Sequence, residues 1–171
     1  MNKDMNEKIS VRKAEARDLD EIIKLLKQLH EAEYPIEKEI TSNMKETSDY
    51  FIEKNIKKLK IEMRKGFKNK KELHIIAELN NKVVGYLNGL VGTHYSKKKK
   101  YSYLDQIVID NKYRKKGIAQ KLMFEFEKFA KQKKANHITL AMFSENEKAM
   151  NLYKKEGYKI RHYILYKKLD D

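Results

Sequence analysis

The chain has 171 residues, of which 40% are hydrophobic and 37% charged, with one proline and no cysteine. This length suits one domain that buries most of its unfolded surface, and the composition excludes a disordered or collagen-like chain. No apolar run is long enough for a membrane span, and the N-terminus lacks the apolar core of a signal peptide. We therefore expect a globular protein of the cytoplasm with no membrane partner, where the lack of cysteine is compatible with a reducing compartment.

The formal net charge is +14, from 39 basic and 25 acidic residues. Such an excess is typical of a nucleic-acid-binding face or of a solvated, lysine-rich surface. Only five of the basic residues are arginine, whereas specific readers of bases and phosphates favour arginine. The lysines are also spread over every segment, so the pattern favours the solvated surface over a nucleic-acid partner.

The N-terminal part predicts a tail, a strand and a helix. Residues 1–8 have the character of a flexible tail, and residues 9–14 alternate weakly as a first strand. Asp18 and Glu21 have the spacing of a capping box ahead of a helical stripe that runs to about residue 30. Pro35 is expected to close that segment.

A second helix and a hairpin follow. The helix is expected to begin at Thr47 or Ser48, with Gly66 as its C-cap. Residues 73–79 and 83–91 predict a β-hairpin, because the Asn-Asn pair between them suits left-handed turn geometry. The lysine run 97–100 predicts a solvated loop tip, and residues 101–109 predict the central strand.

The C-terminal part predicts a helix ending near residue 134 and a strand over 138–143. Ser144 and Glu147 have the spacing of a second capping box, which would open another helix. Gly157 is expected to end this helix, and residues 158–169 to form a final strand. Strands and helices therefore mix along the chain without repeats or linkers, which predicts an α/β fold.

The segment from Leu104 to Met123 joins an apolar strand to an amphipathic helix through a short basic loop. Gly117 begins the helix, so a ligand could approach the backbone closely there. The free N–H groups of a first helical turn and the helix dipole favour negative charge. The spacing matches neither Gly-x-Gly-x-x-Gly nor the Walker loop. The residues predict an anion site of unstated ligand, the alternative being an ordinary turn with solvated lysines.

Two motifs in this part of the chain resemble those of one family. Arg114-x-x-Gly117-x-Ala119, after a strand, resembles the Gln/Arg-x-x-Gly-x-Gly/Ala signature of the GNAT N-acetyltransferase superfamily. Residues 146–158 resemble the family's Asn-x-x-Ala-x-x-Leu-Tyr-x-x-x-Gly-Phe segment. The resemblance implies a GNAT-like acyltransferase fold, with a mixed central sheet of about six to seven strands flanked by about four helices. It implies a single domain over residues 9–171.

The resemblance also implies a cofactor site for acetyl-coenzyme A (acetyl-CoA). The end of the central strand would run along the pantetheine arm, the basic loop and first helical turn would hold the pyrophosphate, and an asparagine downstream would contact the cofactor. The residues implied are Ile107, Val108, Ile109, Arg114, Lys115, Lys116, Gly117, Ile118, Ala119, Gln120 and Asn146. Two of these depart from the family pattern, because lysines replace the usual glycine-containing dipeptide before Gly117.

Two catalytic residues are implied in the same way. Tyr153 matches the tyrosine that protonates or hydrogen-bonds the leaving sulfur in many members of the family, the alternative being a packed aromatic side chain. Asp105 is the candidate base, acting through a water, at a position where relatives that acetylate diamines carry glutamate. Its alternative is an aspartate satisfied by neighbouring groups.

These features predict direct transfer of an acetyl group from acetyl-CoA to a primary amine of a small molecule or peptide. An acetyl-cysteine intermediate is excluded because the chain has no cysteine. The five histidines lack metal-ligand spacing, so no metal is expected. The alternative function is a non-catalytic acyl-CoA sensor or nucleic-acid-associated module on the same fold. Homodimers are common among similar proteins, but the sequence has no signature of one, and it does not identify the acceptor.

Overall fold

The computed structural model describes residues 8–40, 48–94, 99–165 and 167, with the side chains of 34–40 and 48–53 left out of the description. The predictions made for residues 1–7, for Thr47, for Lys97 and for Lys98 concern positions outside these ranges.

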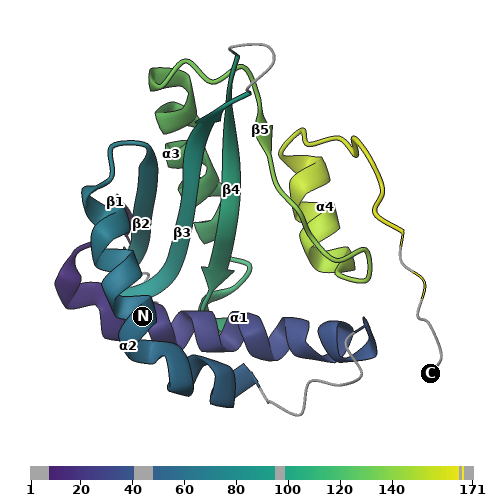
Figure 1. Ribbon diagram of the computed structural model, residues 1–171. Coiled ribbons are helices and arrows are strands. Elements are labelled where there is room, and N and C mark those ends of the chain that lie inside the picture. The colour runs from purple at the N-terminus through teal and green to yellow at the C-terminus, as the bar shows by residue number, and fades with distance from the viewer. Residues whose placement is uncertain (1–7, 41–47, 95–98, 166, 168–171) are drawn as a thin grey trace, which may run out of the picture.

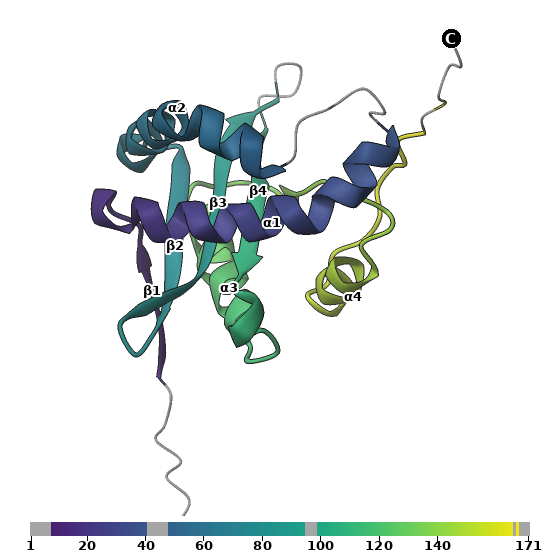
Figure 2. The same cartoon turned by 90° about the horizontal axis from the view of Figure 1, so that it is seen from below.

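Five strands form one sheet in the order β1-β2-β3-β4-β5. The pairs β1–β2, β2–β3 and β3–β4 are antiparallel, and β5 is parallel to β4. Helices α1 and α2 cover one face of this sheet, and α3 covers the other, with α4 beyond β5 (Figures 1 and 2). The elements in chain order are β1 (Ile9–Lys13), η1 (Ala16–Asp18), α1 (Leu19–Ile40), α2 (Ser48–Lys68), β2 (Glu72–Leu79), β3 (Lys82–Thr93), β4 (Lys100–Ile109), η2 (Asn111–Tyr113), α3 (Ile118–Gln132), β5 (Ile138–Thr139) and α4 (Glu147–Lys155).

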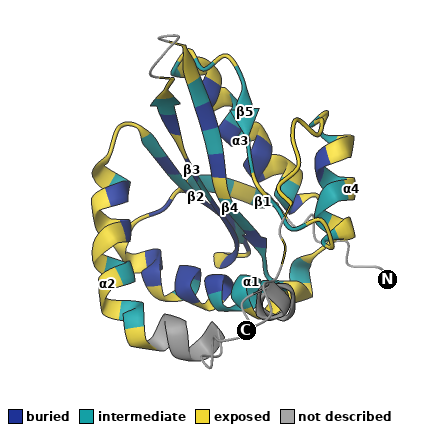
Figure 3. Ribbon diagram, turned by 45° about the vertical axis from the view of Figure 1, so that its right-hand side comes forward, coloured by how far each residue is buried: buried dark blue, intermediate teal, exposed yellow. Residues whose placement is uncertain are grey.

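The sheet is covered by a hydrophobic core on each face, because successive side chains of a strand point to opposite sides. Ile76, Tyr86 and Val108 pack with α1 and Met63 of α2 in one core. The core on the other face joins β2, β3 and β4 to the buried stripe of α3 and to Tyr153 of α4. The buried segments of the central strands run between the two helical layers in Figure 3. The predicted mixed α/β fold is confirmed.

The predicted hairpin is confirmed, with β2 and β3 joined by Asn80 and Asn81. Both asparagines have positive φ, 51° and 61° respectively. Asparagine tolerates this left-handed geometry, and the primed turns that need it match the twist of paired strands.

Two predicted helix ends are wrong. Helix α1 continues through Pro35 to Ile40, and Gly66 lies inside α2, which ends at Lys68. A proline removes one backbone hydrogen bond and can kink a helix without ending it. The glycine is explained by a close contact with β2 that is described below.

Both predicted capping boxes are also wrong. The Asp18 carboxylate accepts from the Glu15 N–H at 2.7 Å and from the Arg12 guanidinium, so it is not paired with Glu21. At α4 the N-cap is Asn146 rather than Ser144. Sequence spacing gives several polar residues the same capping potential, and tertiary contacts decide between them.

The sheet has five strands within the described residues, fewer than the six to seven expected. Strand β5 is only two residues long, because it pairs with β4 at Ser102 and Tyr103 alone. The described part of the predicted final strand, residues 158–165 and 167, has no strand conformation. It therefore leaves apolar side chains in solvent, with Ile164 85% and Leu165 91% exposed. Among the described residues, no helix combines the length and apolarity needed to cross a membrane.

Candidate functional site

The loop between β4 and α3 ends in a helix whose N-cap residue is a glycine. Gly117 is the N-cap of α3 and has φ of 74°, so the cap has no side chain to accept hydrogen bonds from the first turn. A Cβ built on Gly117 would meet nothing within 4 Å. The first N–H groups of α3 therefore donate no hydrogen bond to an N-cap side chain, and they lie at the positive end of the helix dipole, which is favourable for an anion.

Local contacts hold this loop in shape. The Asp110 carboxylate accepts from the Lys112 N–H at 3.0 Å, and the Asp110 carbonyl accepts from the Tyr113 N–H at 2.8 Å. The Arg114 Nε donates to the Ile109 carbonyl at 3.3 Å, so this side chain folds back over the end of β4. Lys115 has φ of 63°, which turns the chain toward the helix.

The predicted cofactor residues divide by exposure. Ile118 is 2% exposed and its side chain belongs to the core. Ala119 is half-buried. The exposed members of the predicted set are Arg114, Lys115, Lys116, Gly117 and Gln120.

Among the residues that the structure describes, the end of β4 has no strand partner on its β5 side. The two strands pair only at Ser102 with Ile138 and Tyr103 with Thr139. Within the described residues, the stretch 104–109 therefore has one strand neighbour, β3. Ile107 and Ile109 pack against the α3 core and Val108 against the α1 core, so what this edge offers a ligand is its backbone.

Helix α4 carries the other two predicted residues. The Asn146 Oδ1 accepts from the Ala149 N–H at 3.1 Å, so this side chain caps α4. Tyr153 is 8% exposed and its ring meets that of Tyr158 at a centroid distance of 5.6 Å. Burial, and secondarily the charge of Glu33, raise the pKa of Tyr153 to about 12. The phenol is therefore a hydrogen-bond donor throughout the neutral range.

Asp105 lies in a β-bulge in the middle of β4. Asn88 pairs with Gln106 and Gly89 with Leu104, so Asp105 is the extra residue. A bulge re-aims side chains, and here Asp105 and Gln106 both border one pocket on the α1 and α2 side. The Asn88 Nδ2 donates to the exposed Asp105 carboxylate at 3.0 Å.

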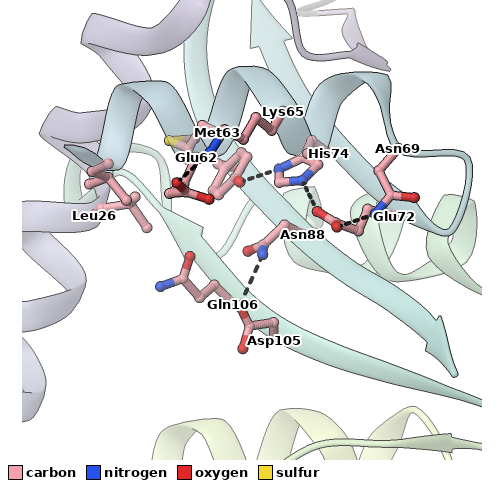
Figure 4. Close-up of a pocket in the computed structure, with 13 residues that line it drawn as sticks. Leu26, Glu62, Met63, Lys65, Asn69, Glu72, His74, Asn88, Asp105 and Gln106 are labelled. Atoms are coloured by element: carbon pink, nitrogen blue, oxygen red, sulfur yellow. Dashed lines mark hydrogen bonds and ion pairs between the residues drawn. The ribbon is translucent and has the colours of Figure 1, made fainter. Parts of the chain in front are cut away.

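The pocket beside Asp105 has a volume of about 350 Å³ and lies between α2 and the strands β2, β3 and β4. Figure 4 shows polar side chains from these elements gathered around it. Three carboxylates and one lysine are among its lining groups, so its charge opposes that of the whole chain. The ionic and polar lining residues are Glu62, Lys65, Asn69, Glu72, His74, Tyr86, Asn88, Asp105 and Gln106.

Sequence reasoning missed the pocket residues of β2 and β3. One signal was present, because His74 and Asn88 interrupt otherwise apolar strands. They are cross-strand partners, so two polar side chains meet on the same face. The Asn88 Oδ1 is buried and has no hydrogen-bond partner among the described residues. The described part of the chain also contains no group of three or more His, Asp or Glu side chains that could hold a metal ion.

Comparison with known proteins identifies the family and the fold. Residues 23–158 match the model of the Acetyltransferase (GNAT) family, and the chain belongs to this family. A search of the curated proteins gave no match.

Several solved structures share the fold. A tetramutant of the BH1408 protein from Bacillus halodurans is 16% identical, with 94% of this chain and 99% of that chain covered and a TM-score of 0.79. The aminoglycoside N-acetyltransferase AAC(6')-Iy in complex with CoA is 15% identical, with 95% of each chain covered and a TM-score of 0.70. The aminoglycoside acetyltransferase meta-AAC0020 from an uncultured soil metagenomic sample is 19% identical, with 95% and 97% covered and a TM-score of 0.65. The predicted GNAT fold is confirmed.

Proposed function

We propose that this chain is an N-acetyltransferase that moves the acetyl group of acetyl-CoA directly to a primary amine. The observation that supports it most is the start of α3, where the N-cap is a glycine and so has no side chain to accept the hydrogen bonds of the first turn. A diphosphate needs such a group of N–H donors with room for the phosphate oxygens. The open space around Gly117 fits this requirement.

The chain's own residues would bind the cofactor in three places. The N–H groups from Gly117 to Gln120 would hold the pyrophosphate, with Arg114, Lys115 and Lys116 adding positive charge. The unpaired β4 edge at residues 107–109 would bind the pantetheine amides by backbone hydrogen bonds, and one N–H there would polarise the thioester carbonyl. Asn146 would contact the cofactor through its amide nitrogen, since its oxygen caps α4.

Acetyl-CoA supplies an activated thioester, so the protein must provide a neutral amine and a site for the leaving thiolate. An alkylamine has an ordinary pKa of about 10.4, so about one molecule in 10³ is neutral at pH 7. Asp105 would attract the ammonium group to the bulge and accept its proton through a water. The orphan Asn88 Oδ1 next to it is a further acceptor for an N–H group.

Tyr153 would stabilise the leaving sulfur. Its pKa of about 12 lies above the ordinary thiol value of about 8.5, so complete proton transfer to a thiolate is uphill. We therefore assign it the role of a hydrogen-bond donor to the developing thiolate, which is the electrostatic form of such catalysis.

The pocket supports a small cationic acceptor. Glu62, Glu72 and Asp105 border it with a single lysine, Lys65, on a chain whose net charge is +14. An amine with more than one positive group would be drawn into this pocket in preference to the rest of the surface. Two of the solved structures with this fold are aminoglycoside acetyltransferases, so aminoglycosides belong in the test alongside polyamines.

The test is thiol release from acetyl-CoA by the purified chain with polyamines, aminoglycosides, amino acids and peptide amines, together with mass spectrometry of the products. We expect release with at least one amine and a product heavier by one acetyl group. Cofactor binding without release from any amine would reject the enzyme and favour the non-catalytic sensor.

A further inference from the structure

Three side chains form a hydrogen-bonded chain along one wall of the pocket (Figure 4). The Tyr86 hydroxyl lies 2.8 Å from His74 Nδ1, and His74 Nε2 lies 3.1 Å from Glu72 Oε2. Exposure rises along this chain, from 1% for Tyr86 to 8% for the His74 side chain and 32% for the Glu72 side chain. The three groups therefore connect the buried floor of the pocket to solvent.

The carboxylate fixes the direction of the hydrogens. An ionised carboxylate only accepts, so the Glu72 contact requires the proton on His74 Nε2. The Nδ1 atom is then an acceptor, and the Tyr86 hydroxyl donates to it. This leaves the lone pairs of the Tyr86 oxygen for a donor from the pocket. Burial, and secondarily the charges of Asp105 and Glu72, raise the pKa of Tyr86 above its ordinary value, so the phenol keeps its proton except during transfer.

Helix α2 has a glycine where the His74 and Glu72 side chains approach it. A Cβ on Gly66 would lie 2.5 Å from His74 Nε2 and 2.6 Å from Glu72 Oε2. A glycine inside a helix is destabilising relative to alanine, so the position is explained by the space that the pair requires. The Phe67 ring makes a T-shaped contact with the imidazole at a centroid distance of 5.1 Å. Asn69 Nδ2 donates to the other carboxylate oxygen of Glu72 at 2.5 Å.

This chain ends beside the proposed amine site. Tyr86, Asn88 and Asp105 all border the same pocket, and the Asp105 charge acts on the Tyr86 hydroxyl. Imidazole is a stronger base than a carboxylate near neutral pH, which is the range in which a general base is most effective.

We propose that His74, reached through Tyr86, accepts the proton of the acceptor ammonium, and that Glu72 aligns His74 and stabilises the imidazolium. This rests on the proposed acetyltransferase function and refines it, leaving Asp105 to bind the ammonium. In the step, an ammonium N–H bond breaks as a new O–H bond forms on Tyr86. The original Tyr86 proton moves to His74 Nδ1, so a neutral amine and an imidazolium result, and no oxidant or further reactant is needed.

The charged groups around His74 favour this step. Glu72 on β2 contacts the ring, and Asp105 on β4 borders the same pocket, so two carboxylates accompany the imidazole in this region. From α2 come Glu62 and Lys65, which pair with each other at 3.0 Å and so offset one another. The remaining polar neighbours, Tyr86, Asn69 and Asn88, are neutral.

The test is the pH dependence of kcat and kcat/KM for the full chain with acetyl-CoA and its best acceptor, for the wild type and His74→Gln. We expect kcat at neutral pH to fall by about 10²-fold or more, with loss of the acidic limb of the profile and an unchanged Kd for CoA. Tyr86→Phe should have the same effect, since it interrupts the relay and keeps the ring. Added imidazole should partly restore kcat in His74→Ala. His162→Gln, which removes an exposed imidazole, is the matched control and should behave as the wild type.

The outcomes separate the two proposals. An active wild type whose acidic limb persists in His74→Gln would overturn the relay and leave Asp105 as the base. A wild type that transfers to no amine would remove the acetyltransferase proposal and the relay together. If His74→Gln does not fold, the tautomer decides: long-range ¹H–¹⁵N spectra of the wild type should show the proton on Nε2 of His74, and a proton on Nδ1 alone would overturn the relay.

Discussion

Gly117 meets two needs at one position, a backbone with positive φ and free space for a ligand. Its φ of 74° favours glycine, and the space where a side chain would begin is empty. In Gly117→Glu the side chain would enter the proposed phosphate site and bring a negative charge to it. We expect the Kd for CoA, measured by calorimetry, to rise by about 10²-fold or more.

Gly157 provides the matched control, because it also has positive φ (84°) and open space, but it lies just beyond the C-terminal end of α4 and not at the start of α3. Gly157→Glu imposes similar backbone strain without placing charge at the start of α3. It should lose some stability and retain CoA binding. Equal loss of binding in both variants would show that strain, and not occupation of the site, explains the effect.

Tyr153 is predicted to act on the leaving sulfur through its hydroxyl. Tyr153→Phe keeps the buried ring and removes only the donor. We expect kcat to fall by about 10- to 100-fold with less than a threefold change in the Kd for CoA, measured by steady-state kinetics and calorimetry. Because the pKa is raised to about 12, no limb of the pH profile below pH 10 should belong to this phenol.

Tyr158→Phe is the control for this change. Its ring packs against Tyr153, and its hydroxyl is buried without a hydrogen-bond partner among the described residues. Removing that hydroxyl should leave kcat unchanged and cost no stability, since an unpaired buried polar group is itself unfavourable. If both variants keep full turnover, Tyr153 is a packing residue.

Among single residues, those candidate site residues that lie in continuous sequence motifs could be predicted from the sequence. Gly117, Asn146 and Tyr153 each fall at a local position, a helix cap or a helix face, that spacing can identify. His74, Tyr86 and Asn88 meet only because β2 and β3 pair in one register, which shifts between Ala77 and Glu78. Asp105 joins them through the separate register of β3 and β4, which shifts after Asn88. Nothing in the local sequence determines either register to within one residue. The sequence therefore shows two polar residues in apolar strands, but it does not show that they face each other.

Helix α2 and strand β2 are joined at Gly66, and this junction makes a stability prediction. Alanine is normally favoured over glycine inside a helix by about 0.5–1 kcal/mol. Here its Cβ would lie 2.5 Å from His74 Nε2, so the gain should be lost as the His74–Glu72 pair is displaced. We expect Gly66→Ala to unfold in urea with no increase in stability and to shift the His74 imidazole resonances.

Lys57→Ala is the control, since Lys57 is exposed on the same helix. It should change the free energy of unfolding by less than about 0.5 kcal/mol and leave the His74 resonances in place. Stabilisation of Gly66→Ala by about 1 kcal/mol, with unchanged resonances, would show that Gly66 is only a helix position without a packing role.

An ion-pair network connects strands β1 and β2 to η1, and its contribution to stability should depend on pH. Arg12 donates to both oxygens of Asp18 at 2.8 and 2.9 Å and to Glu78 at 2.7 Å. The Arg12 hydrogen bonds, reinforced by the Glu15 N–H, hold the pKa of Asp18 below its usual value even though burial opposes this. A carboxylate whose pKa is lower in the folded state stabilises above its unfolded pKa, and this contribution is lost as the pH falls toward the folded pKa.

We therefore expect Asp18→Asn to lower the free energy of unfolding at pH 7 by about 1–3 kcal/mol. The difference from the wild type should shrink as the pH falls below about 4, measured by urea denaturation at a series of acidic pH values. A difference that stays constant with pH would show that the carboxylate charge contributes nothing.

At the scale of elements, the order along the chain was predictable because periodicity and turn residues are local. The hairpin turn and the strand–loop–helix segment are both as expected. Element ends were less predictable, since Pro35 and Gly66 lie inside helices whose other contacts outweigh local preference. The expected final strand is apolar enough but has no pairing partner among the described residues, and a strand exists only in a sheet.

Charge is the property that belongs to the whole molecule. Of the net +14, no single segment holds the excess, whereas the pocket beside Asp105 is acidic and the loop before α3 is basic. The fold thus places two regions of opposite sign at different points along β4. An anionic cofactor and a cationic acceptor would be drawn to different regions, which suits binding of both at once.

This charge pattern predicts a salt dependence for cofactor binding. Exposed charges are screened over about 10 Å at 0.1 M salt and about 3 Å at 1 M. The Kd for CoA should therefore rise on the order of tenfold between 0.05 and 0.5 M NaCl, whereas pantetheine, which has no phosphate, should show little change. Fluorescence or calorimetric titrations at several salt concentrations measure both.

Two double variants then separate the loop from the bulk charge. Lys115→Gln with Lys116→Gln removes two charges at the start of α3, and Lys57→Gln with Lys58→Gln removes two from α2. Because screening limits the reach of exposed charges, the first pair should weaken CoA binding at low salt and reduce its salt dependence, and the second should change neither. Equal effects of the two pairs would mean that net charge alone attracts the cofactor. The proposal that the loop before Gly117 is the phosphate site would then be rejected.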